Sequence, residues 1–289
     1  MIAQIFFSIS PAILIVIFFY FQDRFKEPPI LVLQAFFLGV MTIIPIVVFN
    51  NMFLDNYCWN RIEGSYFAKD FHFNMIRAAF QEEMWKFVVL YYFCSRFTDF
   101  NEPMDGIVYG VAVSLGFSAY ENIEYVLNHQ DFNHSWQTMA QIRVVPTIMH
   151  GTNGAIMGLL LSQVLFFSNN HSRLFLALFI PVLFHCGYNI LISYFFVPTI
   201  VLLIVSVIII LVLVRAINVV QLRNLDEFEK FSIVNRESIN PEGLFNANKL
   251  PINNFAAGQS ILITLVLVWI ICRIVIGYSP EIMPVPLSF

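Results

Sequence analysis

Long apolar runs, separated by short polar or proline-containing segments, dominate the chain. A helix needs about 20 apolar residues, at about 1.5 Å each, to cross a hydrocarbon core about 30 Å thick. The sequence therefore predicts an all-α fold, a polytopic transmembrane helical bundle with its polar site inside. The eight predicted spans lie approximately at residues 2–21, 30–53, 73–94, 104–127, 142–168, 173–195, 198–219 and 258–279.

The same pattern divides the chain into three parts. Residues 1–219 form the main predicted bundle, 220–257 a polar cytoplasmic connection, and 258–289 the last span with a short tail. The first run has no basic segment before it and no small-residue cleavage site, so we expect a retained span and not a signal peptide. The polar connection contains an amphipathic stretch at 222–234, which can lie on the membrane surface or in solution.

Composition favours a bilayer as the surroundings of the chain. Of the 289 residues, 58% are hydrophobic and 12% are charged, whereas soluble domains average about 45–50% and about 25%. The mean hydropathy is +0.74. The net charge is −4, and the basic patch that nucleic-acid binding needs is missing from the sequence.

Lys and Arg residues predict the orientation, because cytoplasmic connections carry an excess of them. If the N-terminus lies outside, the outer connections hold only Arg61, Lys69 and Arg143. We therefore expect both termini to lie outside the cytoplasm. The inner connections then hold nine basic residues: Arg24, Lys26, Arg96, Arg173, Arg215, Arg223, Lys230, Arg236 and Lys249.

Ionisable and amide side chains gather in four consecutive predicted spans, from 73–94 to 173–195. Inside a bilayer such groups are costly unless they are paired or hydrated, which makes them functional candidates. Counted at about 1.5 Å per residue, the glutamates and histidines among them lie roughly 10–15 Å below the outer face, so we expect one shared, hydrated site. The candidates are Glu82, Glu83, Lys86, Glu121, Asn122, His150, His185 and Asn189.

Local spacing predicts partners for some of these residues. Lys86 lies one turn after Glu82, where an ion pair is favourable, and this leaves Glu83 to face another neighbour. His185 and Asn189 project from the same face of one helix. The amide can therefore orient the imidazole or donate to a developing oxyanion.

Five short motifs follow one another along the first six spans. With them the sequence resembles the PrsW family of intramembrane proteases, relatives of the CAAX-prenyl proteases. The resemblance implies a multi-pass protein of a bacterial cytoplasmic membrane that cuts single-span membrane proteins, such as anti-sigma factors, on their outer side. The motifs are Tyr20-x-x-Asp23 leading to Glu27-Pro28, Glu82-Glu83-x-x-Lys86, Phe117-x-x-x-Glu121-Asn122, His150-x-x-x-Gly154 and His185-x-x-x-Asn189.

Peptide hydrolysis by these residues needs a base, an acid and a stabilised oxyanion, and a scheme without metal can supply them. Glu83 or Glu82 activates a water that His150 also holds, and His185 with Asn189 stabilises the tetrahedral intermediate. The resemblance to the prenyl proteases favours this glutamic scheme.

A zinc scheme is the alternative, so the expected cofactor is either none or Zn²⁺. In this scheme the zinc ion is held by two histidines, His150 and His185, and by one glutamate. The glutamate is Glu82, Glu83 or Glu121, and a remaining glutamate is the base. Two histidines and a carboxylate are an accepted catalytic zinc set. The sequence has no HExxH motif, however, and the ligands come from separate helices.

Two functions of other classes use the same buried residues. A transporter or channel relays protons or binds a cation with them, although the inverted repeats and broken helices common in transporters are not evident in the sequence. A non-catalytic scaffold binds single-span proteins through its polar core. Replacing Glu83 with Gln separates these functions, since it stops proton movement in the first and leaves binding intact in the second.

Overall fold

The computed structural model describes residues 1–54, 65–128, 135–167, 173–195, 197–215 and 253–278. Every regular element in this part is a helix, which confirms the all-α class. The protein is a polytopic helical membrane protein. The amphipathic stretch predicted at 222–234 lies outside the described residues. Six helices are long and apolar enough to span a membrane: Ile2–Gln22, Pro29–Met52, Trp136–Phe167, Leu174–Tyr194, Val197–Arg215 and Asn254–Val275.

The first half of the chain builds helices with short breaks between them. Pro29 is the first residue of α2, where a proline is favourable because its fixed φ suits a helix start. Ser65 caps α5 by accepting a hydrogen bond from the Ala68 amide at 3.3 Å. The elements are α1 (Ile2–Gln22), α2 (Pro29–Met41), α3 (Ile43–Phe49), the π-helix η1 (Asn50–Leu54), α5 (Tyr66–His72), the π-helix η3 (Phe73–Phe80), α6 (Gln81–Tyr92) and the 3₁₀-helix η4 (Cys94–Arg96).

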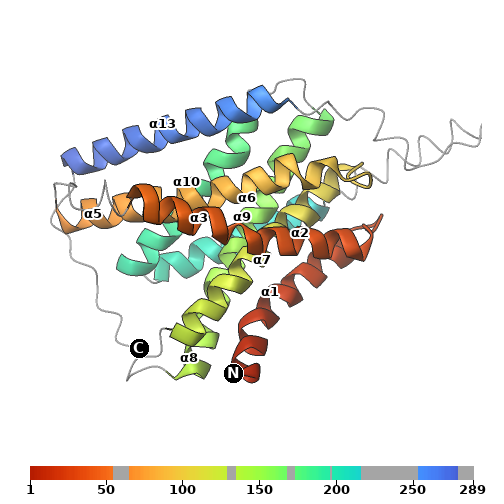
Figure 1. Cartoon of the computed structure of the whole chain (residues 1–289), viewed down its shortest axis with the longest axis horizontal. Coiled ribbons are helices and arrows are strands. Elements are labelled where there is room, and N and C mark those ends of the chain that lie inside the picture. The colour runs from red at the N-terminus through yellow and green to blue at the C-terminus, as the bar shows by residue number, and fades with distance from the viewer. Residues whose placement is uncertain (55–64, 129–134, 168–172, 196, 216–252, 279–289) are drawn as a thin grey trace, which may run out of the picture.

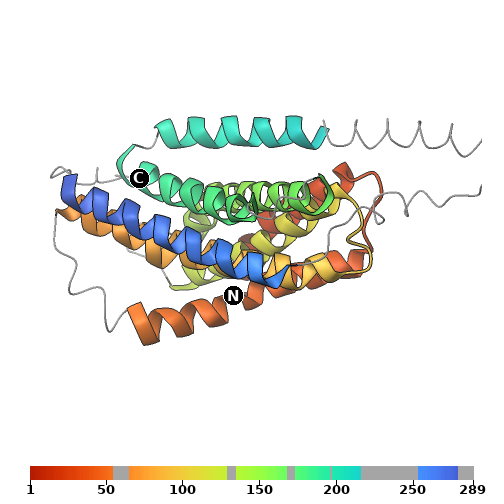
Figure 2. The same ribbon diagram turned by 90° about the horizontal axis from the view of Figure 1, so that it is seen from above.

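The second half contains the longest helices. The Ser135 hydroxyl caps α8 by accepting a hydrogen bond from the Thr138 amide at 3.3 Å. The helix Val197–Arg215 lies at one edge of the bundle (Figure 2), where Leu203 packs against Met149 and Tyr188. The other elements are α7 (Pro103–Asn128), α8 (Trp136–Ile142), α9 (Val144–Ser162), the π-helix η5 (Gln163–Phe167), α10 (Leu174–Tyr194) and α13 (Asn254–Tyr278).

Helix α7 is the centre of the bundle, as Figure 1 shows. Residues 103–119 are all buried, and α1, α2, α6 and α9 pack against the helix. Because protein surrounds α7, it needs little lipid-facing apolar surface and can carry polar residues. This explains why α7, although long, is not among the six helices whose length and apolar character suit a membrane span. By contrast, large apolar side chains such as Leu14, Val212 and Trp269 are exposed on the outer helices, where lipid can cover them.

Glycines bring α7 and α9 into backbone contact. The spacing of Gly154 and Gly158 predicts such an approach, and the structure confirms it. A Cβ atom on Gly158 would lie 1.8 Å from the carbonyl oxygen of Gly106, and one on Gly154 would lie 2.4 Å from that of Gly110. The contact therefore fixes the position of α9, with its polar residues, against the central helix.

Replacing Gly158 with Ala is expected to destabilise the protein by about 1–3 kcal/mol, because the added methyl group forces two backbones apart. Gly258→Ala in α13 is the matched control, since nothing lies within 4 Å of a Cβ atom there. Thermal unfolding of both variants in detergent measures the difference. Equal stability of the two variants would show that the α7–α9 contact is looser than described.

Candidate active site

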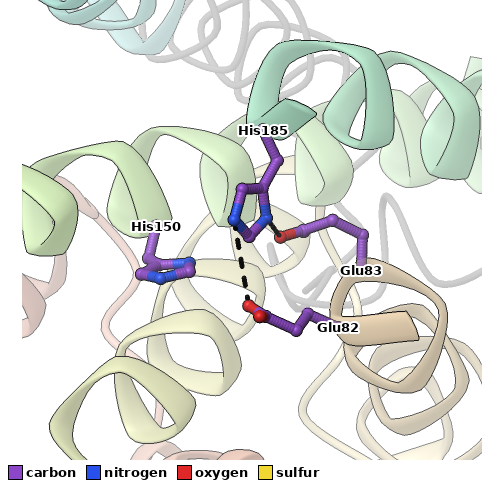
Figure 3. A group of neighbouring side chains, drawn as sticks. All are labelled: Glu82, Glu83, His150 and His185. Atoms are coloured by element: carbon purple, nitrogen blue, oxygen red, sulfur yellow. Dashed lines mark hydrogen bonds and ion pairs between the residues drawn. The ribbon is translucent and has the colours of Figure 1, made fainter. Parts of the chain in front are cut away.

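Four side chains from three helices converge inside the bundle (Figure 3). Glu82 and Glu83 come from α6, His150 from α9 and His185 from α10. One oxygen or nitrogen atom from each lies within 4.8 Å of the others. Glu83 and both histidines are buried, whereas the Glu82 side chain is 13% exposed. The structure thus brings together four of the site residues that were predicted from the sequence on separate spans.

Lys86 supplies a buried positive charge to this group. Its Nζ atom lies 2.9 Å from Glu83 Oε1 and 3.6 Å from Glu82 Oε2. The expected ion pair between Lys86 and Glu82 is therefore present, and Glu83 contacts His185 as well as lying closer to Lys86 than Glu82 does. Glu83 is fully buried and needs a counter-charge more than the partly exposed Glu82 does. The Phe117 ring, whose centroid is 4.1 Å from Nζ, also contacts the ammonium group.

His185 contacts one glutamate with each ring nitrogen. Its Nδ1 atom lies 2.8 Å from Glu83 Oε1, and its Nε2 atom lies 3.9 Å from Glu82 Oε2. An ionised carboxylate only accepts hydrogen bonds, so a neutral ring donates from Nδ1 to Glu83. The Nε2 atom then keeps its lone pair, on the side of the ring that faces Glu82.

His150 is held in a similar way. Its Nδ1 atom lies 3.1 Å from Lys86 Nζ, and its Nε2 atom lies 3.1 Å from Glu121 Oε2. An ammonium group only donates, so Nδ1 accepts from Lys86 and Nε2–H donates to Glu121. The Nδ1 lone pair therefore points toward the ammonium group of Lys86.

Both histidines thus donate one N–H to a carboxylate and turn the other ring nitrogen toward the cluster, where His150 Nδ1 accepts from Lys86 and the lone pair of His185 Nε2 faces Glu82. This is how histidines that bind metal are usually oriented. The buried Oε2 atoms of Glu82 and Glu83 accept no hydrogen bond from the described residues, so acceptor atoms remain for a cation. Two histidines and a carboxylate are a known set of catalytic zinc ligands. The residues present therefore fit a zinc ion.

Arg143 supports the cluster from one side, and sequence reasoning treated it only as a residue at the edge of a span. Its Nη2 atom lies 2.5 Å from Glu121 Oε2, and its Nε atom donates to Asn122 Oδ1 at 2.9 Å. Asn122 in turn donates to Thr147 Oγ1 at 2.8 Å. Arg143 is buried. The sequence offered one signal for this role. Arg143 is a basic residue at the start of an apolar run, and Glu121 and Asn122 are polar residues within another.

Asn189 lies one turn after His185 on α10, as its spacing requires. It is partly buried. Within the described part of the chain, its side-chain amide makes no hydrogen bond with the glutamates or histidines. Its role beside His185 stays a prediction.

The motif that contains Asp23 and Glu27 lies away from this cluster. Both residues are in the connection between α1 and α2, and Glu27 accepts a hydrogen bond from the Tyr109 hydroxyl group. Burial raises the pKa of the Asp23 carboxyl group to about 6 and that of Glu27 to about 7. Tyr109 and Glu121 are separated by about 18 Å along α7, at about 1.5 Å per residue. This motif therefore needs an explanation of its own.

Comparisons with known proteins agree with the geometry. Residues 27–217 match the family model described as PrsW family intramembrane metalloprotease. The chain is 32% identical to Protease PrsW of Bacillus subtilis (strain 168), over 67% of this chain and 84% of that protein. It is 30% identical to Protease PrsW of Halalkalibacterium halodurans, over 63% and 80%, and 28% identical to Protease PrsW of Clostridioides difficile (strain 630), over 73% and 83%. No solved structure matches the chain.

Proposed function

Because the chain belongs to the PrsW family of intramembrane proteases, we propose that Glu82, Glu83, His150 and His185 form its catalytic centre. One observation carries this proposal. Each histidine donates an N–H to a carboxylate and turns its other ring nitrogen toward a shared region that also holds Glu82 and the Lys86 ammonium group. Such an arrangement prepares a place where a cation and a reacting water can be held together.

Zinc is the proposed cofactor, with His150, His185 and Glu82 as its ligands. The orientation of the rings favours Glu82 as the third ligand over Glu83 or Glu121, because those two carboxylates face the N–H side of the histidines. The description of the family as metalloproteases also supports a metal. The glutamic scheme that the sequence favours becomes the alternative. When bound, zinc activates water as a nucleophile and polarises the carbonyl group of the substrate.

Glu83 is the proposed proton acceptor. Its Oε1 atom is engaged by Lys86 and His185, while its buried Oε2 atom accepts no hydrogen bond from the described residues. As the water oxygen bonds to the carbonyl carbon, a water proton passes to this carboxylate. When the C–N bond breaks, Glu83 returns the proton to the leaving amine nitrogen. The substrate oxygen carries the negative charge between these steps.

Two cationic side chains have different roles around this reaction. The Lys86 ammonium group lies in the cluster, 3.1 Å from His150 Nδ1, and can stabilise the negative charge on the substrate oxygen. Arg143 is a positioning residue. It binds the Glu121 carboxylate, which in turn accepts the N–H of His150. Through this chain of contacts Arg143 sets the direction of the His150 lone pair.

The substrate class follows from the membrane and from the open side of the site. The cluster reaches the surface at Glu82 and Glu121, whose side chains are 13% and 19% exposed. A single-span membrane protein, such as an anti-sigma factor, is the proposed substrate, approaching from this side. With both termini outside the cytoplasm, the cut lies toward the outer face.

A reporter assay separates proteolysis from the transporter and scaffold alternatives. The purified protein, in vesicles with a single-span reporter, is expected to cut it, and Glu82→Gln is expected not to. Glu124→Gln, which changes an exposed carboxylate on α7, is the control and is expected to cut like the wild type. Proton movement without cleavage, lost in Glu82→Gln, would contradict the proposal and favour a transporter. Binding of intact reporter by both proteins would favour a scaffold.

A further inference from the structure

A second group of carboxylates lies near the start of α7, far along that helix from Glu121. Asp23 follows the end of α1, Glu102 precedes α7, and Asp105 is in the first turn of α7. One oxygen from each lies within 4.8 Å of the others. Their exposed fractions are only 1%, 2% and 0%. Three acidic groups this close and this buried need a compensating positive charge or shared protons.

The protein itself compensates only part of this charge. Asp23 Oδ1 accepts a hydrogen bond from the Phe25 amide at 3.1 Å. Asp105 Oδ2 accepts two, from the amides of Asn101 and Glu102, each at 2.7 Å. The remaining oxygens, Asp23 Oδ2 and Asp105 Oδ1, are buried and receive no amide, hydroxyl or basic donor from the residues that the structure describes. In that same part of the chain, Lys and Arg form no ion pair with Asp23 or Asp105. The Glu102 carboxyl group lies within hydrogen-bonding reach of Asp23.

A fourth carboxylate extends the group. Glu27 is 4% exposed, and its carboxyl group lies within hydrogen-bonding reach of Asp105. The Tyr109 hydroxyl group donates to Glu27 from the next turn of α7. Backbone amides and the Tyr109 hydroxyl group therefore bind some of the oxygens, and the other partners within the group are carboxyl groups.

We propose that Asp23, Glu102 and Asp105 bind a hard divalent cation, Mg²⁺ or Ca²⁺, through their carboxylate oxygens, with Glu27 beside the ion. These cations prefer oxygen ligands, and several carboxylates together are their usual protein site. The group contains no His or Cys, which separates it chemically from the Glu and His cluster that fits zinc. This site is thus distinct from the proposed catalytic centre.

The position of the site gives the cation a structural role. The ligands come from the end of α1, from the connection before α7 and from α7 itself. A bound ion would therefore join segments that are far apart in the sequence and hold the start of the central helix. Since α7 also carries Glu121 and packs against α9, the ion supports the frame of the catalytic centre without taking part in the reaction.

Thermal unfolding of the full-length protein in a nonionic detergent tests this site. The protein is treated with a chelator, adjusted to equal zinc content in every sample, and then given Mg²⁺ or Ca²⁺. A cation at about 100 times its dissociation constant is expected to raise the Tm by about 5–10 °C. Asp105→Asn is expected to lose this rise. Glu124→Gln, an exposed carboxylate on the same helix, is expected to keep it.

Calorimetric titration of the wild type with Mg²⁺ and with Ca²⁺ covers the case in which Asp105→Asn does not fold. One saturable site for either ion supports the proposal, and the tighter of the two ions identifies the cation. His185→Ala is expected to bind that cation as the wild type does, because its change lies in the zinc cluster. The proposal is overturned if neither ion binds the wild type, or if the cation raises the Tm of Asp105→Asn and Glu124→Gln equally. Protons shared between the carboxyl groups would then be what offsets their negative charge.

Discussion

Replacing Glu83 with Gln is expected to lower the rate of proteolysis by about 10²–10⁴-fold, the usual contribution of a general base. Glutamine has the same shape as glutamate, and its carbonyl oxygen can still accept the N–H of His185, which lies 2.8 Å from Glu83 Oε1. It cannot take a proton from water. Glu82 Oε2, 3.6 Å from Lys86 Nζ, remains as a counter-charge for the lysine. The variant is therefore expected to keep its zinc and its fold while losing the reaction.

The Glu83→Gln experiment combines a rate with a metal content. Cleavage of a single-span reporter gives the rate, and atomic emission gives zinc per protein molecule. Glu82→Gln is the informative comparison, because loss of a proposed ligand should remove zinc as well as activity. Glu124→Gln, at an exposed position on α7, controls for loss of a carboxylate as such. A Glu83→Gln protein that cuts the reporter at the wild-type rate would exclude Glu83 as the base.

Replacing Lys86 with Met is expected to destabilise the protein by about 3–5 kcal/mol, the cost of leaving one partner of a buried ion pair alone. Lys86 and Glu83 are both fully buried, with Nζ and Oε1 2.9 Å apart. Methionine is similar in length to lysine and fills the same space. The lost stability therefore measures the removal of the charge more than a change in side-chain volume. The Phe117 ring also loses its contact with the ammonium group.

The double variant Lys86→Met/Glu83→Gln identifies the cause of that loss. Removing both charges leaves no fully buried carboxylate without its lysine, since Glu82 is partly exposed. The double variant is expected to regain most of the stability that Lys86→Met loses. Denaturation of the wild type, both single variants and the double variant gives the coupling free energy. A Lys86→Met protein as stable as the wild type, or a double variant no more stable than Lys86→Met, would contradict a tight buried pair.

The sequence predicts the fold well because the bilayer imposes a simple rule on length and polarity. Apolar runs mark the outer helices, where side chains such as Leu14 and Trp269 are exposed to lipid. The glycine pair Gly154 and Gly158 likewise predicts the close approach of α9 to another helix. Hydropathy is less informative for α7, since a helix enclosed by protein has no need of an apolar surface.

The site is predictable only as a set of residues at one level of the membrane. Counting along helices places the glutamates and histidines together, but it does not tell which ring nitrogen faces which carboxylate. That depends on how α6, α9 and α10 are rotated against one another. Lys86 can reach both Glu82 and Glu83 from its own helix, and burial decides that the closer pair is with Glu83.

Partners from different helices are harder still to derive from one sequence. Arg143 appears in the sequence as a charge at the edge of a span, and only the packing of α7 against α9 brings it to Glu121. The same holds for Asp23, whose place beside Glu102 and Asp105 depends on how α1 ends near the start of α7. Such contacts join residues that no local spacing relates.

The zinc content of the purified, active wild-type protein tests the central claim most directly. The proposed centre requires about one zinc ion per molecule, as in catalytic sites with two histidines and a carboxylate. His150→Ala and His185→Ala are expected to lose both the zinc and the cleavage of the reporter while remaining folded. Cleavage at the full rate by a wild-type protein that holds no zinc would contradict the metal centre and favour catalysis by the carboxylates alone.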